Sequence, residues 1–426
     1  MSKLKQYPND SEKKPFMQYS SPFNPFNSWK SAFHIKRMIA IKKWMAYNKN
    51  SHPDINIPKE FIPTPVYVTI DPSDACNHGC PWCISSTIQE NDSTVLSKDI
   101  LISLAEFIPK WTKLTTSGPT WVNAIVLAGG GEPLLNKHTP DFIQKVSELR
   151  YYNSHIRNEV SFEQLPEIAL ITNGELLTKD IAKLLIEHAS WTGFSVDAGN
   201  TEDHKKQHEP KHKNKNRDAF QTIVDNIEML CALRKEVKRY VETPLNVGYK
   251  FNIHAWSYTS MLEAARIAKK IGCDQIQFKP TYVDNPDEVY TPEMIEESQS
   301  NIIKARELYE DSTFKVIGMI HKVGPAWQPM LDFSHCSATP LGLIFSADGS
   351  LYLCCDRRGD PKLQLGRWHD GKITRKDFIN ELWGSREHYN LISEINLDEC
   401  PRCTFRFYNQ LMDQSIENDP MNSNFL

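Results

Sequence analysis

The sequence has no uninterrupted apolar stretch close to the ~20 residues that a membrane-spanning helix needs. Residues 1–14 are polar and charged, and they lack the apolar segment of a secretory signal peptide. The sequence therefore shows neither the apolar span that marks membrane proteins nor the signal peptide that marks secreted proteins. We therefore expect a cytoplasmic protein without a membrane partner.

Two further features are absent. The net charge is −4, so no global basic field points to nucleic acid, and no nucleic-acid partner is expected. No internal repeat of 20–50 residues is present, which disfavours a repeat architecture. What remains is a chain of 426 residues with 40% hydrophobic and 24% charged residues, enough for two or three globular domains.

Cysteine is the residue type that points to chemistry. Ten cysteines in a chain without a secretion signal favour metal or redox use over disulfides. Cys76, Cys80 and Cys83 have C-x3-C-x2-C spacing directly after the strand-like run 66–70. Thiolates hold iron–sulfur clusters, and three ligands leave one iron open to a small molecule. A zinc site is the alternative, and it needs a fourth ligand for which His78 is the only nearby candidate.

From residue 65 the pattern alternates between strand and helix. The predicted strands are 66–70, 124–127, 168–171, 193–196, 246–253 and 275–279, and the predicted helices between them are 98–110, 140–152, 178–188, 219–234 and 260–271. Six such units imply a parallel sheet with helices outside. In parallel barrels the functional residues gather at the carboxyl ends of the strands.

The second predicted strand runs into a glycine triplet, Gly129, Gly130 and Gly131, followed by Glu132 and Pro133. Glycines remove side chains where a loop must approach a ligand closely. Glu132 and the glycine carbonyls are placed to accept hydrogen bonds from an ammonium group. A tight turn without a ligand is the alternative interpretation.

The cysteine spacing, with Trp82 in the aromatic position before Cys83, resembles that of the radical S-adenosylmethionine (SAM) enzymes. The resemblance implies an α/β fold, a partial (β/α)6 TIM-like barrel, with a [4Fe–4S] cluster on Cys76, Cys80 and Cys83. It also implies SAM as cofactor and a flavodoxin or ferredoxin as electron donor. Reductive cleavage of SAM would give a 5′-deoxyadenosyl radical that abstracts hydrogen from a substrate.

The same resemblance implies a set of SAM contacts. The glycine triplet and Glu132 would meet the methionyl amine, and Trp82 would pack on the adenine. The polar residues at the matching strand ends are Thr172, Asn173, Ser195, Asp197, Asn252 and His254. Each of these, taken singly, also fits a helix cap or a satisfied polar residue.

A second cysteine set lies near the carboxyl end. Residues 345–353 predict a hairpin with Asp-Gly at its turn, which would bring Cys336 and Cys354 together. The C-x2-C pair of Cys400 and Cys403 could then close a four-thiolate site. A four-cysteine zinc site is the alternative.

This set resembles the auxiliary [4Fe–4S] domain of radical SAM enzymes, called SPASM with two clusters and twitch with one. No cysteine follows Cys403, so one auxiliary cluster is implied, as in the 2-deoxy-scyllo-inosamine dehydrogenase family. By this resemblance Asp356 would bind substrate. Cys355 is left over as an alternative ligand, a hydrogen-atom donor or an inert thiol.

Residues 200–217 contain His204, His208 and His212 among six lysines and arginines. No apolar residue anchors this segment, so we expect a solvated surface loop. A histidine metal site is the alternative.

The predicted domains are an N-terminal extension (1–64), a radical SAM barrel (65–323) and a twitch/SPASM-like domain (324–426). The expected function is an oxidoreductase that oxidises or remodels a small polar substrate such as an amino sugar or aminocyclitol. A radical SAM peptide maturase or epimerase and a zinc-stabilised binding protein are the alternatives. The sequence leaves open the substrate, the net reaction, the oligomeric state and whether Cys354 or Cys355 is the auxiliary ligand.

Overall fold

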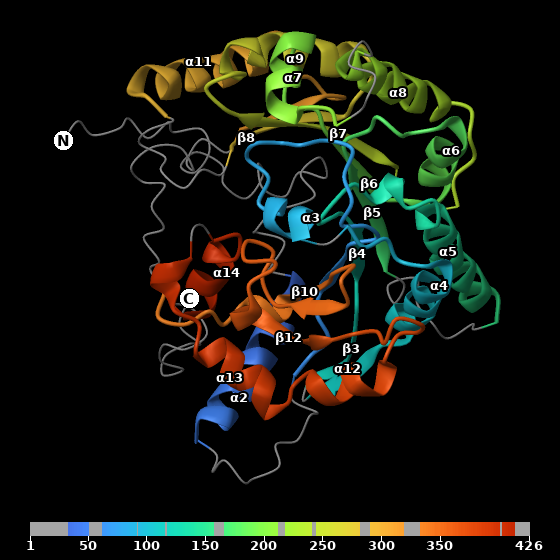
Figure 1. Cartoon of the computed structure of the whole chain (residues 1–426), viewed down its shortest axis with the longest axis vertical. Helices are drawn as coiled ribbons and strands as arrows, with labels where there is room; N and C mark the ends of the chain where they lie inside the picture. Colours follow the sequence, from blue (N-terminus) through green and yellow to red (C-terminus); the bar gives the residue numbers. More distant parts are fainter. Residues whose placement is uncertain are drawn as a thin grey trace.

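One ten-stranded sheet runs through the molecule in the order β12-β11-β10-β1-β4-β5-β6-β7-β8-β9 (Figure 1). This is a computed structural model, and it describes residues 33–50, 62–91, 93–115, 117–156, 166–211, 218–240, 244–281, 290–318, 333–400 and 403–413. The strands from β10 to β9 all pair in parallel, whereas β11 and β12 are antiparallel. This confirms the predicted α/β class with a mostly parallel sheet.

The strands lie close to their predicted positions. Their bounds are β1 (Tyr67–Ile70), β4 (Ala124–Leu127), β5 (Glu167–Thr172), β6 (Trp191–Ser195), β7 (Asn246–Ile253), β8 (Gln275–Pro280), β9 (Lys315–Gly318), β10 (Gly342–Phe345), β11 (Ser350–Tyr352) and β12 (Gln364–Arg367). A separate hairpin joins β2 (Thr112–Thr115) to β3 (Gly118–Trp121). The sequence did not predict this hairpin, β9 or the parallel pairing of β10 with β1.

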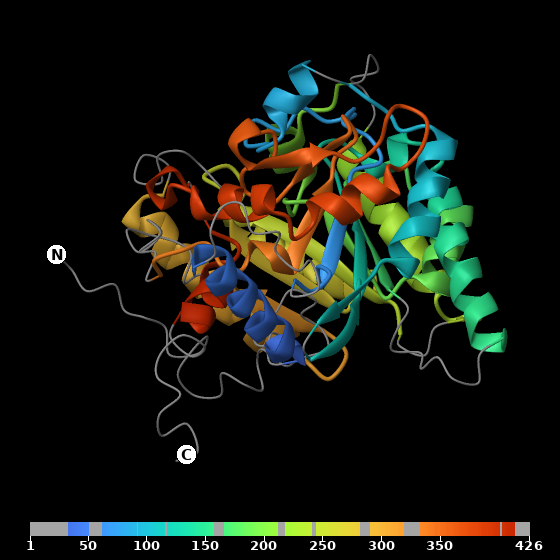
Figure 2. The same cartoon turned by 90° about the horizontal axis from the view of Figure 1, so that it is seen from below.

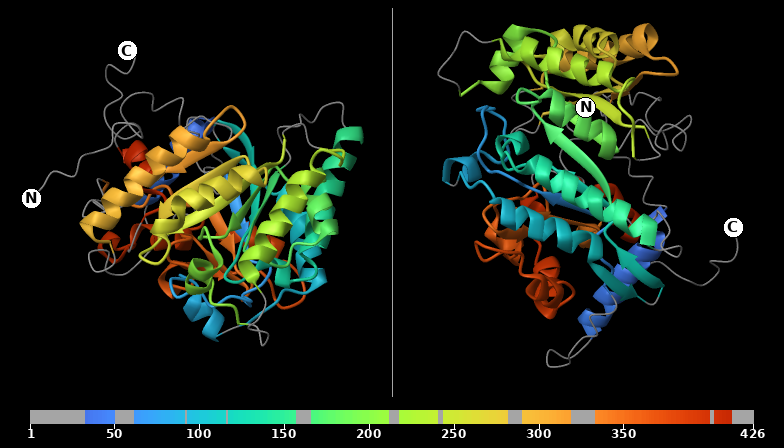
Figure 3. Two further views of the ribbon diagram at one scale, coloured as in Figure 1. Left: turned by 90° about the horizontal axis from the view of Figure 1, so that it is seen from above. Right: turned by 90° about the vertical axis from the view of Figure 1, so that its right-hand side faces the viewer.

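Most helices cover the outer face of the curved sheet (Figures 1 and 3). Their bounds are α2 (Ile35–Asn50), α3 (Ser86–Asn91), α4 (Lys98–Phe107), α5 (Thr139–Ile156), α6 (Lys179–His188), α7 (Thr201–His208), α8 (Ala219–Leu233), α9 (Met261–Lys270), α11 (Pro292–Tyr309), α12 (Lys376–Leu382), α13 (Arg386–Ser393) and α14 (Arg406–Leu411). The helix of residues 98–107 begins where predicted, because the Ser97 side chain accepts a hydrogen bond from Ile100 N. No helix in the described part of the chain is long and apolar enough to span a membrane.

The amino-terminal helix α2 packs against the carboxyl-terminal elements, as Figure 2 shows. Trp44 Nε1 donates to Gly384 O at 3.1 Å, and Trp383 Nε1 donates to Pro63 O at 2.8 Å. Buried indoles need such partners, so these bonds hold α2 and Pro63 against residues 383 and 384. The sheet also crosses the predicted boundary at residue 323, since β10 pairs with β1. The domain division stays a prediction.

Candidate active site

The loop after β1 carries three free thiols, and each of its sulfur atoms has at least one hydrogen-bonding neighbour. Cys76, Cys80 and Cys83 are all partly buried. The contacts are His78 N to Cys76 Sγ at 3.5 Å, His208 Nδ1 to Cys80 Sγ at 3.1 Å and Gln89 Nε2 to Cys83 Sγ at 3.6 Å. Burial raises the pKa of Cys76 to about 12, so this thiol keeps its proton at neutral pH unless a metal ion replaces it.

This donor set fits an iron–sulfur cluster. Hydrogen bonds to the sulfurs are among the features that set the reduction potential of such clusters. In the described residues no three His, Cys, Asp or Glu side chains converge as the ligands of a single metal ion do. In a [4Fe–4S] cluster each thiolate binds a different iron, so the cysteines must stand further apart.

The glycine triplet packs against the cysteine loop itself. A Cβ would lie 2.2 Å from Gly131 O at Gly129, 2.2 Å from Asp74 Oδ1 at Gly130 and 2.0 Å from Ala75 O at Gly131. Glu132 N also donates to Ala75 O at 2.9 Å. Gly130 and Gly131 therefore approach the chain just before Cys76 too closely for any side chain, and their contact with a ligand stays a prediction.

Glu132 is 3% exposed and connects three segments. Its carboxylate accepts hydrogen bonds from Leu134 N at 2.9 Å, Thr172 Oγ1 at 2.6 Å and Asn173 N at 2.8 Å. Burial raises the pKa of Glu132. A carboxylate has about four acceptor positions, so one remains for a ligand ammonium. The Asn173 side chain donates onward to Asn77 Oδ1 at 2.7 Å, which ties the β5 end to the cysteine loop.

The ends of β6 and β7 place the remaining predicted contacts. Ser195 is partly buried at the end of β6. Asp197 is fully buried, and its oxygens already have partners: Asn252 N lies at 2.6 Å and His208 Nε2 at 2.9 Å. Asn252 Oδ1 and His254 Nδ1, by contrast, are buried without a hydrogen-bond partner among the described residues. Buried polar atoms rarely stay unpaired, so these two point to a ligand.

The segment predicted as a solvated loop is partly a buried helix, which corrects that expectation. α7 spans Thr201–His208, and Asn200 begins it by accepting a hydrogen bond from Asp203 N at 2.9 Å. His204 is 1% exposed and His208 is 2% exposed. His212 lies outside the described residues. The signal available in the sequence was the Asn N-cap followed by histidines four residues apart on one helical face.

The two histidines have opposite electrostatics. Burial alone would lower the pKa of His208, but the adjacent Cys80 thiolate and Asp197 raise this pKa to about 10. Burial lowers the pKa of His204 to about 2, so this ring stays neutral. The two rings stack at 4.8 Å between centroids. Sequence reasoning named both residues but placed them on a solvated loop, because their burial depends on polar partners rather than on an apolar pattern.

Three other neighbours of the loop complete the site. His78 Nε2 contacts Glu175 Oε2 at 2.9 Å, with both side chains buried. Trp82 is partly buried, with its ring 5.7 Å from that of His208. Its Nε1 is buried without a hydrogen-bond partner among the described residues. The sequence did not point to Glu175 or to the sulfur contact of Gln89.

The second cysteine set is held around α14. Cys336 is buried, and Cys354, Cys400 and Cys403 are partly buried; all four are free thiols. Asn409 Nδ2 donates to Cys336 Sγ at 3.7 Å. Burial first, and then the charges of Cys336, Asp356 and Cys400, raise the pKa of Cys403. The β10–β11 hairpin turns at Gly349, whose φ is 91°, as the predicted Asp-Gly turn requires.

Asp356 and Cys355 lie against this set. Asp356 is 8% exposed, and its Oδ2 accepts a hydrogen bond from Thr404 N at 2.6 Å, which fixes the C-x2-C turn. Cys355 hydrogen-bonds the Cys354 thiol, and this bond is the largest cause of the raised Cys354 pKa. Burial first and then Cys355 raise the pKa of Tyr67, so the set packs beside the start of β1.

A buried ion pair connects the hairpin with the end of β1. Arg358 Nη2 lies 3.0 Å from Asp71 Oδ1, and the two side chains are 7% and 0% exposed. Burial raises the pKa of Asp71 to about 6, although Arg358 opposes this shift. β1 therefore meets the second cysteine set at its start and delivers the first set after its end.

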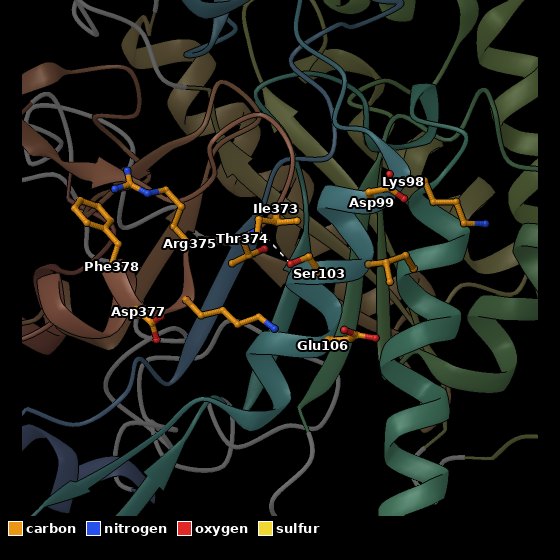
Figure 4. A pocket seen from close by; sticks show the side chains of 11 residues that line it. Lys98, Asp99, Ser103, Glu106, Ile373, Thr374, Arg375, Asp377 and Phe378 are labelled. Atoms are coloured by element: carbon orange, nitrogen blue, oxygen red, sulfur yellow. Dashed lines mark hydrogen bonds between the residues drawn. The ribbon is translucent and has the colours of Figure 1, made fainter.

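A separate groove of about 830 Å³ lies between α4 and residues 373–378 (Figure 4). Lys98, Ser103, Glu106, Ile373, Arg375 and Phe378 are among its lining residues, and Thr374 N donates to Ser103 Oγ at 3.1 Å across it. None of the cysteines or strand-end residues described above lines this groove. It is thus distinct from the candidate active site.

Comparison with known proteins shows a similarity to one family in the middle of the chain. Residues 70–238 match the model of the radical SAM superfamily. Among solved structures, anSMEcpe with bound AdoMet and the Kp18Cys peptide is 19% identical, with a TM-score of 0.52 over 80% of this chain and 88% of that one. SuiB of Streptococcus suis bound to the precursor peptide SuiA is 12% identical, with a TM-score of 0.52 over 86% of this chain and 80% of that one.

A third structure, BtrN in complex with AdoMet and 2-DOIA, is 11% identical over 78% of this chain and 87% of that one. Its TM-score of 0.37 is too low to carry an argument about this chain. At these identities the likenesses to anSMEcpe and SuiB establish the fold alone. The family match covers the cysteine loop, the glycine triplet and the ends of β5 and β6. The similarity to the radical SAM superfamily therefore covers residues 70–238, the part of the chain that carries the first cysteine set.

Proposed function

We propose that the protein binds a [4Fe–4S] cluster on Cys76, Cys80 and Cys83, cleaves SAM reductively, and oxidises or remodels a small polar substrate with the help of one auxiliary cluster. When bound, the cluster and SAM supply a 5′-deoxyadenosyl radical that abstracts hydrogen from the substrate. A flavodoxin or ferredoxin is the proposed electron donor. The protein itself binds and orients SAM and the substrate, and it excludes water from them.

One observation carries this proposal: the three loop cysteines have polar neighbours, and the end of β7 carries buried polar atoms without a partner among the described residues. Each cysteine sulfur has at least one hydrogen-bonding neighbour from the protein. The unpaired atoms, Asn252 Oδ1 and His254 Nδ1, lie at the end of β7. Strand ends are where parallel α/β folds bind ligands, and SAM supplies hydroxyl, ammonium and carboxylate groups that can pair with such atoms.

The further SAM contacts follow from the same geometry. The free acceptor position of Glu132 would take the methionyl ammonium. Trp82 would cover the adenine, and Nε1 of its indole is available to a ligand acceptor. Ser195 and the 129–131 backbone stay proposed contacts. Thr172, Asn173 and Asp197 support the site by hydrogen bonds within the protein.

The auxiliary cluster is proposed on Cys336, Cys354, Cys400 and Cys403. Asn409 supports this proposal, because an amide donor on a cysteine sulfur suits a cluster thiolate. Asp356 is the proposed substrate residue, with Cys355 as the hydrogen-atom donor if the reaction is an epimerisation. In a two-electron oxidation the auxiliary cluster would accept the second electron from the substrate radical.

Peptide modification is the second candidate. It is favoured by the fold neighbours, since anSMEcpe and SuiB were both solved with bound peptides. A peptide maturase and an oxidase of amino sugars differ in what increases their SAM cleavage. Both use the same first cysteine set, so the residues around Cys76 do not distinguish them.

The test is anaerobic reconstitution followed by SAM cleavage with two substrate panels, aminocyclitols and amino sugars in one and cysteine- or serine-containing peptides in the other. We expect 5′-deoxyadenosine formation that rises with a member of the first panel, and a product two mass units lighter than the substrate. A rise with peptides alone would favour the second candidate. Native protein that holds zinc and no iron would contradict both.

A further inference from the structure

We propose that His208 is a hydrogen-bond donor to the Cys80 ligand of the cluster and that it raises the reduction potential of that cluster, with Asp197 as its positioning residue. The inference rests on the cluster proposed for Cys76, Cys80 and Cys83. It concerns two buried side chains from outside the cysteine loop, on α7 and directly after β6.

The contact geometry distinguishes His208 from the other two sulfur neighbours. His208 Nδ1 lies 3.1 Å from Cys80 Sγ, whereas the contacts on Cys76 and Cys83 are 3.5 and 3.6 Å long. The His208 side chain is 2% exposed, so water does not compete for the bond. Hydrogen bonds in such a dry environment are electrostatically stronger than those in water.

Chemistry assigns the direction of this bond once iron is bound. A metal-bound thiolate carries no proton, so the contact requires the proton on His208 Nδ1. The other ring nitrogen, Nε2, faces Asp197 Oδ2 at 2.9 Å as an ion pair rather than as an aligned hydrogen bond. A carboxylate oxygen is an acceptor, so the side of the ring away from Cys80 faces an acceptor as well.

The surroundings fix the ring in this orientation. Asp197 is fully buried and is held by Asn252 N at 2.6 Å. The ring of His204 stacks on that of His208 at 4.8 Å, and the ring of His78 packs at 5.4 Å. The ring therefore has little freedom to turn away from the sulfur, as expected of a residue that tunes a metal ligand.

The consequence for the cluster follows from charge. Reduction adds an electron, and part of that charge resides on the sulfurs. A donor beside Cys80 stabilises the reduced form more than the oxidised form, which raises the midpoint potential. Because SAM cleavage needs the reduced cluster, His208 would enlarge the fraction of enzyme that a weak donor can reduce.

The test is an EPR-monitored redox titration without SAM, in a Cys336→Ala/Cys403→Ala background that leaves only the first cluster. In His208→Leu we expect the ratio of reduced to oxidised cluster at a fixed electrode potential to fall about tenfold, which is ~59 mV for one electron. His208→Asn keeps an amide donor near the position of Nδ1 and should restore most of the ratio. Iron content is measured in parallel.

His204→Leu is the matched control, since His204 is equally buried on the same helix and has no hydrogen bond to a cysteine sulfur among the described contacts. Its midpoint should equal that of the background protein. An unchanged midpoint in His208→Leu, or an equal fall in His204→Leu, would overturn the inference.

If His208→Leu does not retain iron, Asp197→Asn answers the same question. It keeps an acceptor beside Nε2 but removes the charge, so we expect a smaller fall in the midpoint, and no fall would again overturn the inference. Absence of iron in the wild-type protein would instead contradict the proposed function, which separates the two failures.

Discussion

The two cysteine sites differ in how the chain assembles them. Cys76, Cys80 and Cys83 lie on one short loop, and the fold brings donors to them from α3 and α7. The second set comes from three separate segments, before η9 (Thr339–Leu341), after β11 and around residues 400–403. The cysteines of the first site are thus close in sequence, and the fold supplies only their surroundings. The cysteines of the second site come together only when the chain folds.

Their surroundings differ as well. The first site has buried acid–histidine pairs, His78 with Glu175 and His208 with Asp197. The second lies beside a small apolar cluster that includes Met38 and Ile41 of α2. Buried polar pairs hold side chains in fixed directions, while apolar packing holds segments together. The first site thus has polar side chains in fixed positions, and the second lies where remote parts of the chain pack together.

Removal of the first set should have the largest effect. Changing Cys76, Cys80 and Cys83 together to Ala should abolish formation of 5′-deoxyadenosine, because no ligands remain for the cluster that binds SAM. Iron should fall by about half, from about eight to about four atoms per chain, if both sites hold [4Fe–4S] clusters. Iron analysis and chromatography of SAM products measure this. Continued SAM cleavage in this variant would contradict the assignment.

Removal of the second set should separate SAM cleavage from substrate oxidation. Cys336→Ala or Cys403→Ala should lose only the auxiliary cluster and keep part of the SAM cleavage, while product formation from substrate is lost. The matched control is Cys231→Ala, since Cys231 is buried in the core away from both sets. Stoichiometric zinc bound to Cys336 and Cys403 in the native protein would show that the second site is structural.

The strands and the first cysteine loop could be predicted because their information is local. β7 spans Asn246–Ile253 as its apolar run predicts, and the spacing of Cys76, Cys80 and Cys83 needs no tertiary contact to be recognised. The pairing of β10 with β1 could not be predicted, since residues about 275 apart in the chain meet through loop closure.

The buried histidines could not be predicted for a different reason. α7 is polar at nearly every position, so no apolar period marks its buried face. His208 is buried because Asp197 and Cys80 compensate its charge, and these partners come from the segment after β6 and from the loop after β1. The glycine triplet was recognised, but its packing partner, Ala75, is visible only in three dimensions.

A smaller effect should come from Asp356, where structure and proposed chemistry overlap. Asp356→Asn keeps an oxygen that can accept from Thr404 N but removes the negative charge. If the charge binds substrate, KM should rise about tenfold or more with both clusters intact, because a charged hydrogen bond contributes about 1.5–3 kcal/mol. Steady-state kinetics and iron content test this. Unchanged KM with intact clusters would leave Asp356 a purely structural role.

The smallest effect concerns pH, and it contrasts a neutral histidine with the charged His208. His388 of α13 is fully buried against Trp44 and Trp383, with ring centroids 5.1 and 4.5 Å away. Burial lowers its pKa to about 3. Between pH 3 and 6.5 the unfolded chain therefore binds a proton at His388 that the folded protein excludes. The free energy of unfolding must then fall as pH decreases through this range.

From pH 6.5 to 5 the His388 contribution is about 2 kcal/mol, since each pH unit is worth about 1.4 kcal/mol. We expect the free energy of unfolding of the wild-type protein, measured with urea, to fall by about this amount more than that of His388→Gln over the same interval. His208 has a raised pKa, so its contribution is present below pH 6.5 and is lost only as pH rises toward 10. An equal pH dependence of the free energy of unfolding in His388→Gln and in wild type would contradict this prediction. It would mean that the interface between α2 and α13 accepts a protonated His388 ring.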